Sequence, residues 1–239
     1  LAAGQCRGAW VEVEQAPRGG VGTSPGVMVE LRRAAMARLD TQKARRRIKR
    51  RAGMVNDMLA ELSSGSLDCY VGRVDWDRLP PGLSDVLRLD PLTVTDLVLA
   101  CSITHPLAGR TDVPARELLD WQWALPPEDS NNRIAFEAAF RNHGLKGPAP
   151  AVEMPGDPNA LILLASQVHY LTCVPRIALA AHVATETLCV LELPDLRLPP
   201  IQIGFVTLAH NEDMASLQPL RQALAHAAHP SAPRRIGAV

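Results

Sequence analysis

The chain has 239 residues, 47% of them apolar and 21% charged, and its 25 Lys and Arg balance its 25 Asp and Glu. This length and apolar content allow a buried core, as one large domain or two small lobes. No apolar run reaches the roughly 18 residues of a membrane span, and no basic-then-apolar signal segment is visible at the N-terminus, so we expect a cytoplasmic protein.

Charge is unevenly distributed along the chain, whereas the five cysteines are widely spread. Residues 1 to 53 hold 12 Lys or Arg and 4 Asp or Glu, and seven of the nine residues from Lys43 to Arg51 are basic. This run could contact phosphate groups, but it lacks interleaved aromatic residues, so a solvated strand or loop is favoured.

The five cysteines form no CxxC pair. They indicate reduced, buried thiols, and we expect neither metal nor cofactor.

The first predicted elements flank a turn of small residues. Residues 1 to 18 are interrupted by glycine and proline and stay unassigned. Residues 21 to 26 have the character of a short strand that turns into a helix. The helix would bury Met28, Leu31, Ala35 and Leu39. Thr23 and Ser24 would stand at its N-terminus, where free amides suit a carboxylate, although plain helix capping is the alternative interpretation.

A helix followed by a strand is predicted between Met54 and Asp75. Four apolar side chains share one stripe of the helix, namely Val55, Met58, Leu59 and Leu62. Gly65 offers the left-handed conformation that ends a helix. Apolar residues then alternate over residues 66 to 71, as in a short strand that Gly72 ends. A helix that leads directly into a strand is half of a β-α-β unit.

The middle of the chain contains a long apolar run and an aromatic strand. The run Leu97 to Ile103 is long enough for a buried strand, which His105 and Pro106 end. We assign His105 no chemistry, because a lone histidine before proline is more often a loop residue than a ligand or a base. A short helix is expected around Val113 to Leu119, and alternation predicts a strand over Trp121 to Leu125.

Two further polar turns precede predicted helices. Ser130, followed by Asn131, is the best cap for a helix that His143 and Gly144 end. Asp157 and Pro158 supply the cap and the first residue of the next helix. If these turns converge with the turn at Thr23 and Ser24, they form a cleft whose donors and hydroxyls would bind a small polar ligand.

The C-terminal part is predicted to hold three strands and one helix. The strands are Leu171 to Val174, Leu188 to Leu193 and Ile201 to Leu208, with proline-rich turns between them. The helix carries an apolar stripe of Met214, Leu217, Leu220, Leu224 and Ala228. Residues 229 to 239 have the composition of a frayed tail.

Five short motifs resemble the effector-binding domain of LysR-type transcriptional regulators in order and spacing. They are LxxLxxGxLD over Leu59 to Asp68, PPGL over Pro80 to Leu83, LVLxxxxxHPLA over Leu97 to Ala108, WxLPPxxSxxRxxFExxFxxxGL over Trp123 to Leu145, and VPR over Val174 to Arg176. The resemblance covers about residues 20 to 228. It implies an α/β fold of two Rossmann-like lobes joined by two crossover strands, as in type 2 periplasmic binding proteins.

The resemblance also implies lobe limits and a site. Lobe one would comprise residues 19 to 96 and 198 to 228, and lobe two residues 97 to 197. A small effector, expected to be anionic, would bind between the lobes. The family's ligand positions correspond to Thr23, Ser24, Gly72, Arg73, Ser130, Asn131, Met154, Asp157 and Phe205. Arg73 would either pair with the effector or be a surface arginine at a strand end, and Phe205 would form an apolar wall.

Other expectations come from the family's architecture. A homodimer or tetramer would form through lobe one, and DNA would be bound only through a winged helix-turn-helix that these residues lack. The basic run stands where the family usually has a proline, and residues 166 to 170 are bulkier than its glycine-rich turn. A solute-binding protein of the same fold, which would need an export signal, and a truncated, ligand-blind fragment are the alternatives.

An enzyme is the least favoured interpretation. Cys101 with His105, or Ser130 with His143, could supply a nucleophile and a base. Neither pair lies in a recognisable motif such as GxSxG, HExxH or a glycine-rich phosphate loop. We therefore expect a binding domain without catalytic activity.

Overall fold

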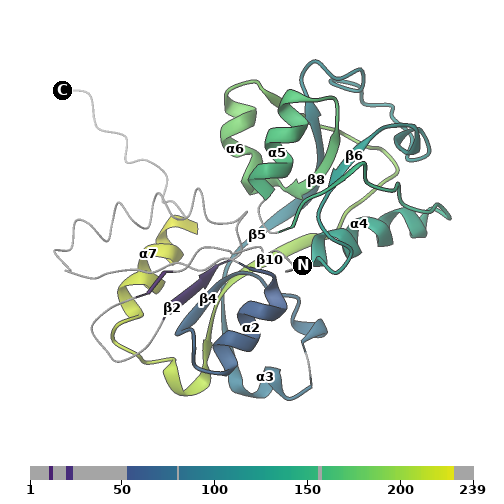
Figure 1. The fold of residues 1–239 in the computed structure, drawn as a ribbon. Coiled ribbons are helices and arrows are strands. Elements are labelled where there is room, and N and C mark those ends of the chain that lie inside the picture. The colour runs from purple at the N-terminus through teal and green to yellow at the C-terminus, as the bar shows by residue number, and fades with distance from the viewer. Residues whose placement is uncertain (1–10, 13–19, 24–52, 80, 156–157, 229–239) are drawn as a thin grey trace, which may run out of the picture.

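The computed structural model describes residues 11–12, 20–23, 53–79, 81–155 and 158–228. Several predictions lie outside these residues, namely the helix after Ser24, the basic run from Lys43, the cap Asp157 and the tail from residue 229. The described chain forms two sheets with helices packed on both faces of each (Figure 1).

The first sheet brings together strands from distant parts of the chain. Its order is β1 (Val11–Glu12), β2 (Gly20–Thr23), β4 (Cys69–Arg73), β10 (Pro200–Leu208) and β5 (Leu87–Ser102). β2 and β4 are parallel, whereas β1 with β2, β4 with β10, and β10 with β5 pair antiparallel. The helices α2 (Val55–Ser63) and α7 (Gln218–Ala228) cover opposite faces, and the short α3 (Leu83–Val86) precedes β5.

The second sheet also uses β5. β5 lies between β9 (Leu188–Val190) and β8 (Leu171–Pro175), followed by β6 (Trp123–Leu125) and β7 (Val152–Glu153). β6 is parallel to both β7 and β8. One face packs against α4 (Asn131–Asn142) and the other against α5 (Pro158–Gln167) and α6 (Arg176–Ala184). Short 3-10 helices cover Trp76–Arg78, Glu117–Asp120 and Ala209–Asn211.

One long strand and one return segment join the two sheets. Residues 87 to 96 of β5 pair with β10, and residues 97 to 102 pair with β8 and β9. After β9 the chain runs back to β10 in the first sheet. This arrangement confirms the predicted α/β fold with two crossovers. We call the first sheet and its helices lobe one and the second sheet and its helices lobe two; the residue limits given above stay a prediction.

Most local predictions are confirmed. The stripe of α2 is buried at Met58, Leu59 and Leu62, and Gly65 adopts a φ of 73° beyond its end. Ser130 is the N-cap residue of α4, and Gly144 adopts a φ of 67° after it. These elements depend on capping and periodicity within a few residues, which the sequence contains directly.

Four predictions of secondary structure need correction. β4 runs to Arg73 and is buried along its whole length, so Gly72 lies inside a two-faced buried strand and does not end it. α6 occupies residues 176 to 184, for which only a proline-rich turn was predicted. Pro175 directly precedes this helix. β5 begins at Leu87 despite Pro91, which lies beside a register shift in the pairing with β10. Around Val113 to Leu119 there is only the 3-10 turn Glu117–Asp120.

Candidate functional site

A pocket of about 290 Å³ lies between the two lobes. Lobe one contributes the N-terminal end of α2 and parts of β4 and β10, and lobe two contributes the N-terminal end of α4 and the end of β8. The lining residues are Gly53, Met54, Val55, Asn56, Asp57, Arg73, Asp129, Ser130, Asn131, Asn132, Pro175 and Ile201. We call this the interlobe pocket. Any molecule that fills it contacts both lobes.

Arg73 crosses the gap between the lobes inside this pocket. Its Nε lies 2.9 Å from both carboxylate oxygens of Asp75, and its Nη2 lies 2.8 Å from Asp75 Oδ1. Its Nη1 donates a hydrogen bond of 2.7 Å to Asn132 Oδ1 on α4. The residue is only 9% exposed. Arg73 is therefore a buried link between the lobes whose charge Asp75 balances, and the alternative of a surface arginine is wrong.

Two helix N-termini border the interlobe pocket. The first amides of an α-helix have no partner within the helix and carry a partial positive charge, so they suit an anionic or acceptor-rich group. The Ser130 hydroxyl makes no capping hydrogen bond to α4, and Met54 offers none to α2. These ends can therefore donate to a bound molecule.

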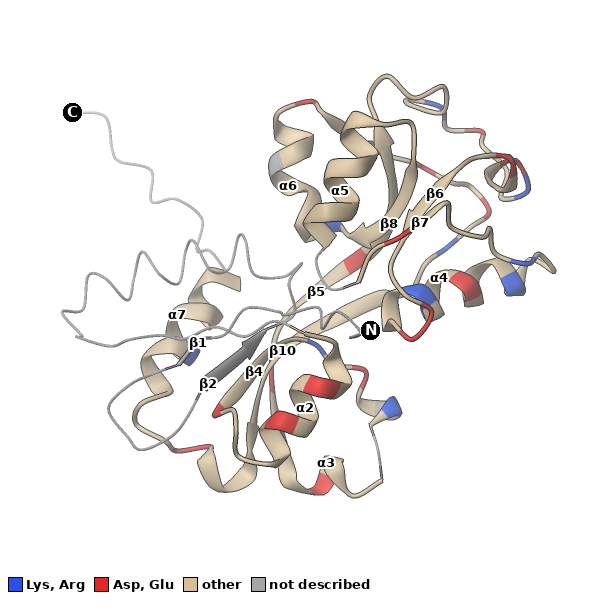
Figure 2. Cartoon of the chain, viewed as in Figure 1, with Lys and Arg blue, Asp and Glu red and all other residues tan. Residues whose placement is uncertain are grey.

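Two carboxylates add negative charge at the rim. Asp57 belongs to the first turn of α2, where Figure 2 shows acidic positions, and Asp129 directly precedes the cap of α4. Both side chains are exposed, and neither forms an ion pair within the described part of the chain. The pocket thus combines helix-end donors and a balanced arginine with two acceptors at its edge.

The predicted site residues fall into three groups. Arg73, Ser130 and Asn131 line the interlobe pocket together. Gly72 is buried in β4 opposite Gly204, and the backbone of Thr23 pairs with Val71 at the end of β2. Ser24 and Asp157 lie outside the described residues.

Met154 and Phe205 pack into the lobes. Met154 is partly buried against the cluster formed by β6, α5 and α6. Phe205 is completely buried, with a relative exposure of 0%. Its ring packs against α7, and Arg221 Cζ lies 5.3 Å from the ring centroid. The structure therefore places Phe205 in the core of lobe one, where it supports β10, and its predicted position as a wall of the cleft is corrected.

Sequence reasoning missed Asn132, Asp57 and the residues just before α2 as parts of the pocket. Asn132 is in the same polar turn as Ser130, so its polar side chain already indicated a possible site residue. Its partner Arg73, however, lies 59 positions away in the sequence. The N-terminus of α2 carried no hydroxyl or amide cap at Met54 and gave no local sign of a site.

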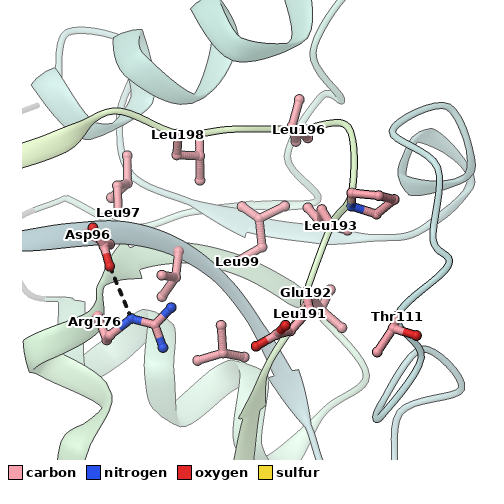
Figure 3. Close-up of a pocket in the computed structure, with 13 residues that line it drawn as sticks. Asp96, Leu97, Leu99, Thr111, Arg176, Leu191, Glu192, Leu193, Leu196 and Leu198 are labelled. Atoms are coloured by element: carbon pink, nitrogen blue, oxygen red, sulfur yellow. Dashed lines mark ion pairs between the residues drawn. The ribbon is translucent and has the colours of Figure 1, made fainter.

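A second cavity, of about 380 Å³, lies beside the chain crossover and is drawn in Figure 3. Leu97 and Leu99 of β5 face leucines of the return segment, whose apolar members are Leu191, Leu193, Leu196 and Leu198. At its edge Arg176 Nε lies 3.5 Å from Asp96 Oδ2. We call this the crossover pocket. Six of its 13 lining residues are leucines, and the pocket was not predicted.

His105 fits the structural role expected for it. The residue is buried, its Nδ1 accepts a hydrogen bond of 3.1 Å from the Leu107 amide, and its ring lies 4.5 Å from that of Trp121. Burial lowers the pKa of His105, as does the charge of the nearby His169, while a hydrogen bond to the His169 backbone acts in the opposite direction. The neutral imidazole therefore holds the loop after β5.

The family comparison decides the identity of this domain. The model of the LysR substrate binding domain matches residues 17–228. The chain belongs to this family. LysR substrate-binding domains are the effector-binding parts of transcription regulators, and the family is generally non-enzymatic. A search among curated protein sequences found no match.

Solved structures of LysR regulatory domains share the fold. The CcmR regulatory domain from Synechocystis PCC6803, in complex with 2-PG, aligns with a TM-score of 0.69 and 16% identity, covering 89% of this chain and 98% of its own. The QuiR effector-binding domain with shikimate gives 0.63 and 15%, covering 86% and 94%. The MetR regulatory domain from N. meningitidis gives 0.63 and 13%, covering 89% and 94%.

The described residues contain neither a membrane-spanning helix nor a cluster of metal ligands. None of the helices is long and apolar enough to cross a membrane. No group of three or more His, Cys, Asp or Glu side chains in the described ranges is arranged to hold a metal ion.

Proposed function

We propose that this LysR substrate-binding domain senses a small metabolite in the interlobe pocket and converts its binding into a changed angle between the lobes. The observation that carries this proposal is the hydrogen bond from Arg73 to Asn132, which ties lobe one to lobe two at the pocket itself. A ligand that competes with this bond or adds to it has a different affinity for open and closed arrangements, and that difference is what shifts a conformational equilibrium.

The pocket favours an effector with an acidic group together with hydroxyl or amino groups. An acid can accept from the amides at the start of α2 and α4. Because Asp75 already balances Arg73, the arginine by itself is a weaker anion site than its type suggests. Asp57 and Asp129 would accept hydrogen bonds from hydroxyl or ammonium groups on the same molecule. Hydroxy acids and amino acids therefore fit better than simple dicarboxylates.

The assembly and location of the protein follow the family pattern in this proposal. The domain would form a homodimer or tetramer through lobe one, act in the cytoplasm and catalyse no reaction. DNA contact would come from a winged helix-turn-helix outside these residues. A solute-binding protein with this fold and a ligand-blind fragment are the alternatives, and the experiment below distinguishes the fragment.

Thermal shift of the purified chain against hydroxy acids, amino acids, sugar acids, aromatic acids and acyl-CoA compounds tests the proposal. A compound present at a hundred times its dissociation constant adds about 2.7 kcal/mol to the free energy of unfolding, which raises the melting temperature measurably. A sharp transition that no compound raises would contradict effector sensing and favour the ligand-blind fragment.

A further inference from the structure

Two thiols face each other in lobe two, where β5 pairs with β9. The Sγ atoms of Cys101 and Cys189 are 3.5 Å apart, and the two residues are direct partners in the register of the strands. Directly opposed residues on antiparallel strands project from the same face of the sheet. The sulfur atoms therefore meet without any change in the pairing of the strands.

The backbone at this pair permits a disulfide. Leu191 N donates to Leu99 O at 2.9 Å, and Ile103 N donates to Thr187 O at 3.4 Å. These bonds lie two residues to either side of Cys101, so Cys101 and Cys189 form a hydrogen-bonded pair, whose Cα atoms are typically about 5.5 Å apart. That separation lies within the range of roughly 4.4 to 6.8 Å found in disulfides. Rotation of the two side chains is sufficient to close the bond.

The two thiols differ in access to solvent. Cys101 is fully buried, and burial together with the neighbouring Cys189 thiol raises the pKa of Cys101. Cys189 is partly exposed, so an oxidant reaches it first. Cys69 and Cys173 are also buried, and burial raises the pKa of each. These two residues provide an internal comparison, since among the described residues the Sγ–Sγ contact is the one between Cys101 and Cys189.

We propose that Cys101 and Cys189 form a redox modification site at which a hydroperoxide converts the two thiols into a disulfide. The Cys189 sulfur attacks the peroxide oxygen and becomes a sulfenic acid, releasing water when the oxidant is hydrogen peroxide. The Cys101 sulfur then attacks the Cys189 sulfur, and its proton leaves with the hydroxyl group as a second water. Two thiols are oxidised and one peroxide is reduced, so no other reactant is needed.

The disulfide would fasten the crossover of the chain. β9 pairs with β5 through only three residue pairs and leads directly into the return segment toward β10. Leu99 and Leu191, the next register pair on the same face, line the crossover pocket in Figure 3. A covalent bond two residues away would hold these leucines in place. Oxidation would thereby stiffen the connection between the lobes, independently of whether the interlobe pocket binds an effector.

Peptide mapping of the oxidised chain tests the site. The purified chain is treated with hydrogen peroxide, its remaining thiols are blocked with N-ethylmaleimide, and its peptides are analysed by mass spectrometry without reductant. We expect one linked pair that joins the peptides of Cys101 and Cys189, lighter by two hydrogen atoms and separated by dithiothreitol. Hydrogen exchange of residues 188 to 191 should slow in the oxidised form.

Two variants serve as controls. In Cys189→Ser the link should disappear while Cys101 stays alkylatable after denaturation, and in Cys173→Ser the link should form as in the parent chain. The site is disproved if Cys189 in the parent chain is oxidised to sulfinic acid without linking to Cys101, or if Cys101 links equally to Cys173. Mapping of the parent chain decides between these outcomes even where a variant fails to fold.

Discussion

The interlobe pocket and the crossover pocket each hold an arginine beside an aspartate, in opposite surroundings. Arg73 and Asp75 have side-chain exposures of 11% and 20% with a separation of 2.8 Å, whereas those of Arg176 and Asp96 are 53% and 62% with a separation of 3.5 Å. Solvent screens the exposed pair, but the buried pair must satisfy its donors within the protein. The buried pair lies within lobe one and leaves the Arg73 guanidinium bonded to Asn132 of lobe two, whereas the exposed pair is expected to contribute little to stability.

Replacing Arg73 should have the largest effect. In Arg73→Ala the Asp75 carboxylate and Asn132 Oδ1 lose their donors in a mostly buried position. We expect the free energy of unfolding to fall by about 2 to 3 kcal/mol, below the value for a fully buried pair because Asp75 is partly exposed. Urea denaturation measures this loss. A stability equal to that of the parent chain would show that the buried pair is no more important than the exposed one.

Removing only the contact between the lobes should have a smaller effect. Asn132→Ala keeps the Arg73–Asp75 pair and deletes the bond from Arg73 Nη1. We expect a loss of about 1 kcal/mol and a wider distribution of lobe angles, visible as a larger radius of gyration in small-angle X-ray scattering. An unchanged scattering curve would mean that other contacts hold the lobes together.

Replacing Arg176 should have the smallest effect. Its ion pair with Asp96 is more than half exposed on both sides. Arg176→Ala should change the free energy of unfolding by less than about 0.5 kcal/mol, because exposed pairs contribute little. Urea denaturation in parallel with Arg73→Ala makes the two pockets directly comparable, and similar losses of stability in both variants would show that the buried and exposed ion pairs contribute alike.

The sequence predicted best what depends on a few neighbouring residues. Ser130 occupies the predicted N-cap position of α4, although its hydroxyl makes no capping hydrogen bond, and Gly144 adopts the predicted left-handed conformation after the helix. Both follow from chemistry within one turn of helix. The two-lobed fold was implied by the resemblance of five short motifs to LysR effector-binding domains, and the shared use of β5 by both sheets agrees with it.

The sequence could not predict what depends on tertiary contacts. The burial of Arg73 and its bond to Asn132, 59 positions away, could not be predicted, although its ion-pair partner Asp75 is only two residues away. Phe205 was expected in the cleft, but the apolar stripe of α7 covers it. α6 was missed because Pro175 was interpreted as a turn, although a proline just ahead of the first helical turn is fully compatible with a helix.

The central claim is that an effector contacts both lobes at Arg73 and Asn132. Isothermal titration of the best compound from the thermal-shift panel into the parent chain, Asn132→Ala and Arg176→Ala tests it most directly. We predict a loss of affinity of about tenfold or more, which corresponds to about 1.4 kcal/mol, in Asn132→Ala and none in Arg176→Ala. Equal affinity in all three proteins, or a loss only in Arg176→Ala, would contradict the assignment of the effector to the interlobe pocket.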